Sequence, residues 1–119
     1  MKKILIVDDD PLNLEILKEV FETGGYKIET ASDGQQAIAV LEKNTGIDLV
    51  LTDLEMPRVN GREVAEFAKG HKPDLPVIIM TGVGLSEKLK EKLIATGVKA
   101  IIFKTFKFAK LEGEVMKLI

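Results

Sequence analysis

The sequence of 119 residues contains no cysteine and a single histidine, His71. The absence of cysteine excludes disulfides, thiolate chemistry and cysteine-based metal sites, and one histidine cannot form a histidine-cluster metal site. No apolar run approaches the roughly 18 residues that a membrane-spanning helix requires. The first residues, in which a short apolar run is followed by three aspartates, do not have the pattern of a signal peptide. We therefore expect a cytoplasmic protein without a membrane partner.

The charges of the chain are nearly balanced, with 17 Lys and Arg against 19 Asp and Glu. Neither the whole chain nor any segment of it carries the basic patch on which nucleic-acid binding depends, so we expect no direct nucleic-acid partner. The length fits one domain over residues 1–119, and a hydrophobic content of 45% is enough to build a core.

Short apolar runs alternate along the chain with stretches of helical periodicity. Four runs have the pattern of strands buried on both faces of a parallel sheet, at residues 4–7, 49–51, 77–80 and 100–103. A fifth run, residues 26–31, alternates polar and apolar residues as an edge strand does. Apolar residues at helical spacing occupy residues 12–21, 37–41, 64–68, 89–94 and 108–118. This alternation predicts an α/β fold, a three-layer (βα)5 sandwich around a parallel sheet.

Polar residues follow the predicted strands at the points where the strands end. They are Asp8, Asp9 and Asp10 after the first strand, then Asp53, Thr81 and Lys104 after the third, fourth and fifth. In an open parallel sheet the ligand crevice lies beyond these carboxyl ends, so we expect the side chains to converge there. Asp10 is the exception, because an aspartate before Pro11 is typical of a helix N-cap.

This set of side chains is suited to phosphoryl transfer. Carboxylates held close together raise each other's pKa, and a divalent cation relieves their repulsion. Oxygen ligands without histidine or cysteine favour Mg²⁺, and Mg²⁺ beside a lysine and a hydroxyl can stabilise a transferring phosphoryl group. We predict that Asp53, which stands alone at the end of its strand, is the nucleophile, and that Asp8 and Asp9 hold the metal.

At this point the chain resembles the receiver domain of two-component response regulators over almost its whole length. The matching residues are Ile4-Leu5-Ile6-Val7-Asp8-Asp9, Asp53-Leu54-Glu55-Met56-Pro57 followed by Gly61, Thr81 and Lys104. The resemblance implies a flavodoxin-like fold, with the strand order 2-1-3-4-5 of the chemotaxis regulator. It also implies that Asp53 accepts a phosphoryl group, that Thr81 and Lys104 bind that group, and that Mg²⁺ is held by Asp8, Asp9, Asp53 and the backbone carbonyl of Glu55.

The same resemblance implies a signalling switch, and not an enzyme beyond self-phosphorylation and slow autodephosphorylation. Its expected partners are a histidine kinase or phosphotransfer protein, which supplies the phosphoryl group, and a downstream protein. The downstream contact would use the surface of the fourth helix, fifth strand and fifth helix, which could also support a homodimer.

Two residues depart from the family pattern. Thr105 stands where the family has a proline in a cis peptide bond, and a cis bond before any other residue costs about 2.5–4 kcal/mol. We therefore expect a trans bond and a displaced Lys104. Ile101, three residues before the lysine, replaces the aromatic residue of the family's conformational switch. An aliphatic side chain has no ring to swing inward behind Thr81.

These departures keep two alternatives to the switch open. One is a pseudo-receiver, an interaction module that binds its partners independently of phosphate. The other is an aspartate-nucleophile phosphohydrolase, because an apolar strand that runs into Asp53-Leu54-Glu55 is similar to the haloacid dehalogenase signature. The second acid is glutamate here, however, and no cap domain fits within the chain.

Overall fold

Five parallel strands alternate with five helices along the chain, as the sequence predicts. The computed structural model describes residues 1–43, 46–82, 84–104 and 107–119. The strands are β1 (Lys3–Val7), β2 (Lys27–Ala31), β3 (Leu49–Asp53), β4 (Val77–Thr81) and β5 (Ala100–Phe103). The helices are α1 (Pro11–Thr23), α2 (Gly34–Lys43), α3 (Gly61–His71), α4 (Glu87–Thr96) and α5 (Phe108–Leu118). The predicted (βα)5 alternation is confirmed.

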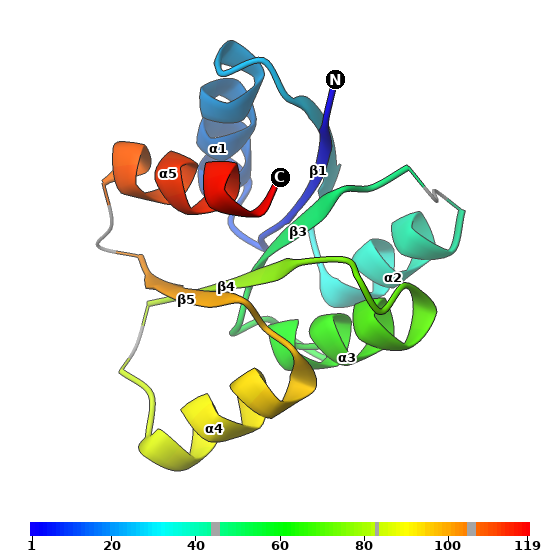
Figure 1. Cartoon of the computed structure of the whole chain (residues 1–119), viewed down its shortest axis with the longest axis vertical. Coiled ribbons are helices and arrows are strands. Elements are labelled where there is room, and N and C mark those ends of the chain that lie inside the picture. Colours follow the sequence, from blue (N-terminus) through cyan, green and yellow to red (C-terminus); the bar gives the residue numbers. More distant parts are fainter. Residues whose placement is uncertain (44–45, 83, 105–106) are drawn as a thin grey trace.

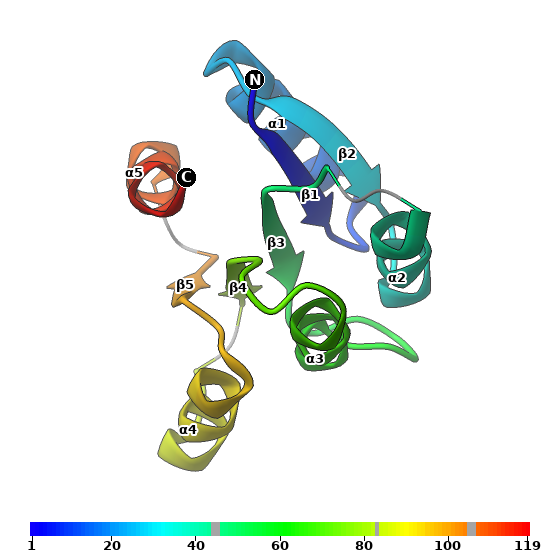
Figure 2. The ribbon, with the colours of Figure 1, turned by 45° about the vertical axis from the view of Figure 1, so that its right-hand side comes forward.

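The strands form one sheet in the order β2-β1-β3-β4-β5, which confirms the predicted order 2-1-3-4-5 (Figure 2). All four strand pairs are parallel. The alternating strand β2 lies at one edge of the sheet, as its pattern predicts. The apolar run of β5 was interpreted as buried on both faces, and this is wrong, because β5 forms the other edge and Phe103 is 43% exposed.

Helices cover both faces of the sheet (Figure 1), and their side chains make two separate apolar layers. Alternate residues of each strand point to opposite faces, so Val77 and Ile79 pack with α2, α3 and α4, and Ile78 and Met80 pack with α1 and α5. The three central strands are buried along most of their length between these layers. Only the ends of the strands are therefore left to form a polar site.

Two of the helices that begin near the carboxyl edge of the sheet, α1 and α3, have polar caps beside the site. The Asp10 side chain accepts a hydrogen bond of 3.0 Å from the Leu12 N–H, with Pro11 as the first helical residue, which confirms its predicted capping role. At the start of α3, Asn60 and Glu63 exchange side-chain and backbone hydrogen bonds in a capping box.

Within the described ranges, no helix is long and apolar enough to cross a membrane.

Candidate functional site

The predicted site residues lie together at the carboxyl edge of the sheet. Asp53 and Thr81 are the last residues of β3 and β4, and Asp8 and Lys104 directly follow β1 and β5. Backbone hydrogen bonds align these ends, since the Leu54 N–H donates to the Met80 carbonyl at 2.8 Å and the Lys104 N–H donates to the Thr81 carbonyl at 2.7 Å. Four strand ends that are far apart in the sequence thus share one edge.

Three carboxylates form the centre of the site. Asp8, Asp9 and Asp53 each place one oxygen within 4.8 Å of the other two. Asp8 is fully buried and Asp53 is only 3% exposed, whereas Asp9 faces solvent. Among the described residues, buried polar or charged side chains occur at Asp8, Thr52, Asp53 and Thr81. Burial of polar groups is costly, so their concentration at one edge marks this edge as functional.

The Lys104 ammonium group joins two of these carboxylates. Its Nζ donates a hydrogen bond of 2.9 Å to Oδ2 of Asp53 and lies 3.4 Å from Oδ2 of Asp8. Burial by itself lowers the pKa of Lys104, but the hydrogen bond to Asp53 and the two negative charges outweigh burial and raise it. Lys104 therefore carries a positive charge at neutral pH and offsets part of the negative charge of the cluster.

Asp53 is the carboxyl group that its surroundings perturb most clearly. Burial raises its pKa from 3.8 to about 6, and the negative charges of Asp8 and Glu55 act in the same direction. The hydrogen bond and the positive charge of Lys104 act against this rise. At neutral pH Asp53 is thus mostly ionised while it is poorly solvated, which is the state of a reactive oxygen nucleophile.

Thr81 makes a contact that the sequence did not predict. Its hydroxyl group donates to the Glu55 carboxylate, with distances of 2.7 Å to Oε1 and 3.1 Å to Oε2. The sequence resemblance implies a role only for the backbone carbonyl of Glu55. Glu55 lies in the loop between β3 and α3, where no periodicity predicts the direction of a side chain. The acidic residue two positions after Asp53 was the only signal available.

Gly61 allows α3 to begin directly against the end of β3. A Cβ atom at this position would lie 2.2 Å from the backbone oxygen of Asp53 and 2.9 Å from Cα of Leu54. The Gly61 N–H also donates to the Leu54 carbonyl at 2.9 Å. Glycine is therefore required at position 61, because two backbones approach each other closely behind Asp53.

The donor set at this edge fits a hard divalent cation. Asp8 Oδ1 accepts a hydrogen bond of 2.9 Å from the Asp10 N–H, but its buried Oδ2 accepts none from the described residues. Its polar contact among these residues is the ion pair with Lys104, at 3.4 Å, which is longer than a typical N–H···O hydrogen bond. A buried carboxylate oxygen with this long contact, next to two further carboxylates, has the chemistry of a Mg²⁺ ligand.

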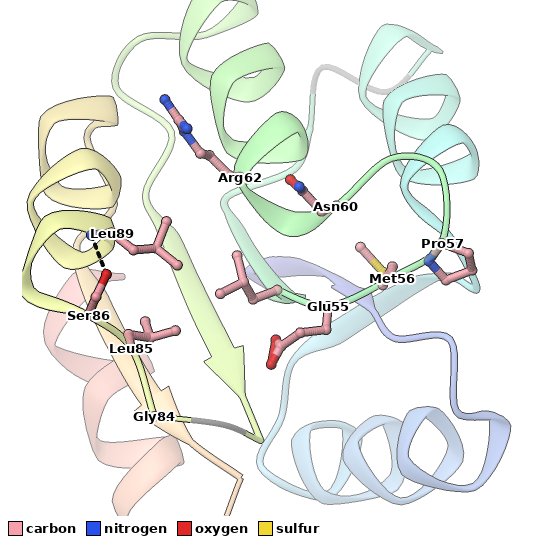
Figure 3. Close-up of a pocket in the computed structure, with 10 residues that line it drawn as sticks. Glu55, Met56, Pro57, Asn60, Arg62, Gly84, Leu85, Ser86 and Leu89 are labelled. Atoms are coloured by element: carbon pink, nitrogen blue, oxygen red, sulfur yellow. Dashed lines mark hydrogen bonds between the residues drawn. The ribbon is translucent and has the colours of Figure 1, made fainter.

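A cleft of about 670 Å³ lies next to the site, between the β3–α3 loop and the start of α4 (Figure 3). Leu54, Leu85 and Leu89 make its apolar part. Glu55 projects from the β3–α3 loop at the mouth of this cleft, across from Gly84 and Leu85 (Figure 3). Glu55, which contacts Thr81, therefore also lines this cleft.

The two departures noted in the sequence have different outcomes. Ile101 is half-buried and packs against the apolar layer under α2, α3 and α4, so it has the role of a core residue. The expectation for the peptide bond at Thr105 lies outside the described residues. Lys104 nevertheless reaches Asp53.

Comparison with known proteins relates the chain to two kinds of signalling protein. It is 37% identical over 101 residues to the sensor histidine kinase RcsC of Escherichia coli K12, covering 85% of this chain and 10% of RcsC. It is 38% identical over 81 residues to the response regulator SaeR of Staphylococcus aureus USA300, covering 68% of this chain and 35% of SaeR. The chain therefore spans only a minor part of either relative.

A solved structure has the same fold. The response regulator TrrA of Thermotoga maritima, in complex with Mg²⁺ and BeF, is 35% identical, covers 100% of both chains and superposes with a TM-score of 0.88. The family model of the response regulator receiver domain matches residues 4–116, which is nearly the whole chain. This chain therefore belongs to the response regulator receiver domains.

Proposed function

We propose that this chain is a phosphorylatable switch of a two-component system and that Asp53 accepts the phosphoryl group. The observation that carries the proposal is the Asp53 carboxylate itself. It is 3% exposed, lies beside two further aspartates and accepts a hydrogen bond of 2.9 Å from Lys104. A strained, ionised carboxylate with a cation next to it has the properties of an oxygen nucleophile.

Receiver domains act as signalling switches, not as catalytic enzymes, and they interact with histidine kinases or phosphotransfer proteins. This favours the switch over the phosphohydrolase that the Asp53-Leu54-Glu55 stretch left open. The phosphoryl donor would be the phosphohistidine of a kinase or phosphotransfer protein. The extent of the domain, residues 1–119, and the cytoplasmic location of the protein stay predictions.

The proposed reaction is a single displacement at phosphorus. An oxygen of Asp53 forms the new O–P bond, the P–N bond of the phosphohistidine breaks, and its electron pair returns to the imidazole, which takes up a proton. Lys104 would neutralise one phosphoryl oxygen, and the Thr81 hydroxyl would donate a hydrogen bond to another. The hydrogen bond of 2.9 Å from Lys104 to Asp53 supports this role.

Receiver domains bind Mg²⁺ at an acidic site. In this chain Asp8, Asp9, Asp53 and the backbone carbonyl of Glu55 would hold the ion. The buried Oδ2 of Asp8, which lacks a hydrogen-bond donor among the described residues, supports the assignment. When bound, Mg²⁺ would supply positive charge to the transferring phosphoryl group.

The downstream contact is proposed for the surface of α4, β5 and α5. Ile94 on α4 is 64% exposed and Phe103 on β5 is 43% exposed, so this surface offers large apolar side chains to a partner. The partner would be a downstream protein or a second copy of this chain. Sedimentation of the protein alone with beryllofluoride distinguishes the two: a dimer that Ile94→Asp abolishes indicates a second copy, and a monomer indicates a downstream protein.

Intact-mass measurement after incubation with acetyl phosphate and Mg²⁺ tests the acceptor. We expect the mass of one phosphoryl group to be added, and we expect the addition to disappear without Mg²⁺ and in Asp53→Asn. Asp74→Asn, which changes an exposed loop aspartate, is the matched control and should behave like the unmodified chain. Incorporation in Asp53→Asn at the normal level would contradict the proposal. A complete lack of incorporation would make the phosphate-independent interaction module the better interpretation.

A further inference from the structure

We propose that the Glu55 carboxylate is an internal competitor for Thr81, which holds the threonine hydroxyl until a phosphoryl group displaces it. The inference rests on the proposed function, because it concerns the same site. It assigns to the side chain of Glu55 a positioning role that is separate from the expected role of its backbone carbonyl. The Thr81–Glu55 contact carries it.

The geometry of the Thr81–Glu55 contact shows which group donates the hydrogen bond. Thr81 is fully buried at the end of β4, and its hydroxyl group lies 2.7 Å and 3.1 Å from the two oxygens of the Glu55 carboxylate. An ionised carboxylate only accepts hydrogen bonds, so the hydroxyl must be the donor. Hydrogen bonds to ionised acceptors are stronger than those between neutral groups. Thr81 is therefore held by a charged group 26 residues away in the sequence.

The single proton of the Thr81 hydroxyl group limits how many acceptors it can serve. A threonine hydroxyl has one proton to donate, and phosphoryl oxygens, like carboxylate oxygens, are acceptors. Thr81 therefore cannot donate fully to Glu55 and to a phosphoryl group on Asp53 at the same time. Binding of the phosphoryl group must break or weaken the contact with Glu55.

The Glu55 side chain can move away from Thr81. Thr81 is enclosed by the sheet, but Glu55 is exposed and lies at the mouth of the cleft of about 670 Å³ (Figure 3). Its carboxylate can therefore turn into solvent and remain hydrated, so release costs little beyond the lost hydrogen bond.

The test is the affinity for beryllofluoride, a stable substitute for the phosphoryl group, measured by calorimetry at saturating Mg²⁺. Glu55→Ala removes the competitor, and we expect it to tighten binding roughly tenfold, a typical effect of one charge-assisted hydrogen bond. Thr81→Val removes the donor with little change of shape. In the Thr81→Val background, Glu55→Ala should change the affinity by no more than about twofold, because the two residues then no longer interact.

Three further variants separate the hydrogen bond from simple charge. Glu55→Gln keeps an acceptor oxygen without the charge and should tighten binding less than Glu55→Ala does. Thr81→Ser keeps the hydroxyl and should restore the full effect of Glu55→Ala. Glu91→Ala removes an exposed glutamate on α4 as the matched control and should leave the affinity unchanged. If Thr81→Val fails to fold, Thr81→Ala takes its place as the donor-free background.

The outcomes distinguish this inference from the proposed function. Equal tightening by Glu55→Ala with and without the Thr81 hydroxyl would show that Glu55 acts by charge alone, and it would overturn the inference. An unchanged affinity in Glu55→Ala would do the same, and in both cases the proposed function would stand. A chain that binds no beryllofluoride at all, with Mg²⁺ present, would overturn the proposed function and the inference together.

Discussion

The ammonium group of Lys104 lies 2.9 Å from Oδ2 of Asp53, although the two residues are 51 positions apart in the chain. The contact joins the end of an edge strand to the end of a central one. It also connects the charge of the lysine to the pKa of the carboxyl group, because Lys104 lowers the pKa of Asp53 against the effect of burial. This relationship makes the electrostatics of the site testable without any phosphoryl donor.

The first prediction concerns that coupling. Lys104→Met removes the positive charge and keeps an unbranched apolar side chain, so the pKa of Asp53 should rise further above its value of about 6. The carbon chemical shift of the Asp53 carboxyl group, followed by NMR as a function of pH, measures the change. Lys110→Met, on an exposed residue of α5, is the control and should leave the Asp53 titration where it is. An unchanged pKa in Lys104→Met would contradict the contact.

The second prediction concerns stability and pH. The folded state raises the pKa of Asp53 from 3.8 to about 6, so the folded protein prefers the protonated form. The protonated Asp53 carboxyl group stabilises the folded state fully below the pKa that it has in the unfolded chain. This stabilisation is lost as the pH rises through the pKa that it has in the folded protein. Ionisation of Asp53 therefore lowers the free energy of unfolding by about 3 kcal/mol at pH 7.5 and by about 1 kcal/mol at pH 4.5.

Asp53→Asn removes the titrating group and should therefore increase the free energy of unfolding at pH 7.5. We expect a gain of up to about 3 kcal/mol, since the pKa of about 6 already includes the opposing effect of Lys104. Urea unfolding at pH 7.5 and pH 4.5 measures the effect, and the gain should shrink at the lower pH. A variant that is less stable at pH 7.5, or a gain that does not depend on pH, would refute the argument.

The third prediction concerns metal binding. Mg²⁺ binds the folded site and should raise the melting temperature, with a stabilisation of about 2.7 kcal/mol at a hundredfold excess over the dissociation constant. Asp8→Asn and Asp9→Asn should abolish this increase. Asp10→Ala removes a neighbouring carboxylate that only caps α1. It should lower stability by about 1 kcal/mol and leave the response to Mg²⁺ intact. An equal loss of the response in Asp10→Ala would show that the ion binds the aspartate run without selectivity.

The fourth prediction concerns the backbone behind Asp53. Gly61→Ala would place a Cβ atom 2.2 Å from the Asp53 carbonyl oxygen, so α3 or the end of β3 must move. We expect a loss of about 2 kcal/mol or more in the free energy of unfolding and weaker binding of beryllofluoride.

Gly113→Ala is the matched control for this substitution. Gly113 lies within α5, and a Cβ atom there meets nothing within 4 Å. Alanine is the better helix former by about 0.5–1 kcal/mol, so this variant should be more stable. Denaturant unfolding of both variants measures the difference. Similar stability in the two variants would contradict the close approach at Gly61.

Much of the fold and part of the site follow from the sequence. The apolar runs that end at Val7, Leu51 and Met80 predict buried parallel strands, because both faces of such strands must be apolar. The carboxyl ends of parallel strands lie at one edge, so polar residues placed just after the runs had to meet there. The convergence of Asp8, Asp53 and Lys104 needed no knowledge of loop structure.

Other features depend on the tertiary structure alone. The apolar run of β5 does not reveal that Phe103 is half exposed, because exposure depends on which strand lies at the edge of the sheet. The hydrogen bond from Thr81 to Glu55 depends on the path of the β3–α3 loop, and side chains in loops have no sequence period. Composition and order along the chain thus determined which groups reach the site. The packing of strands and loops decided which of them touch, since contacts between distant residues exist only once the sheet has formed.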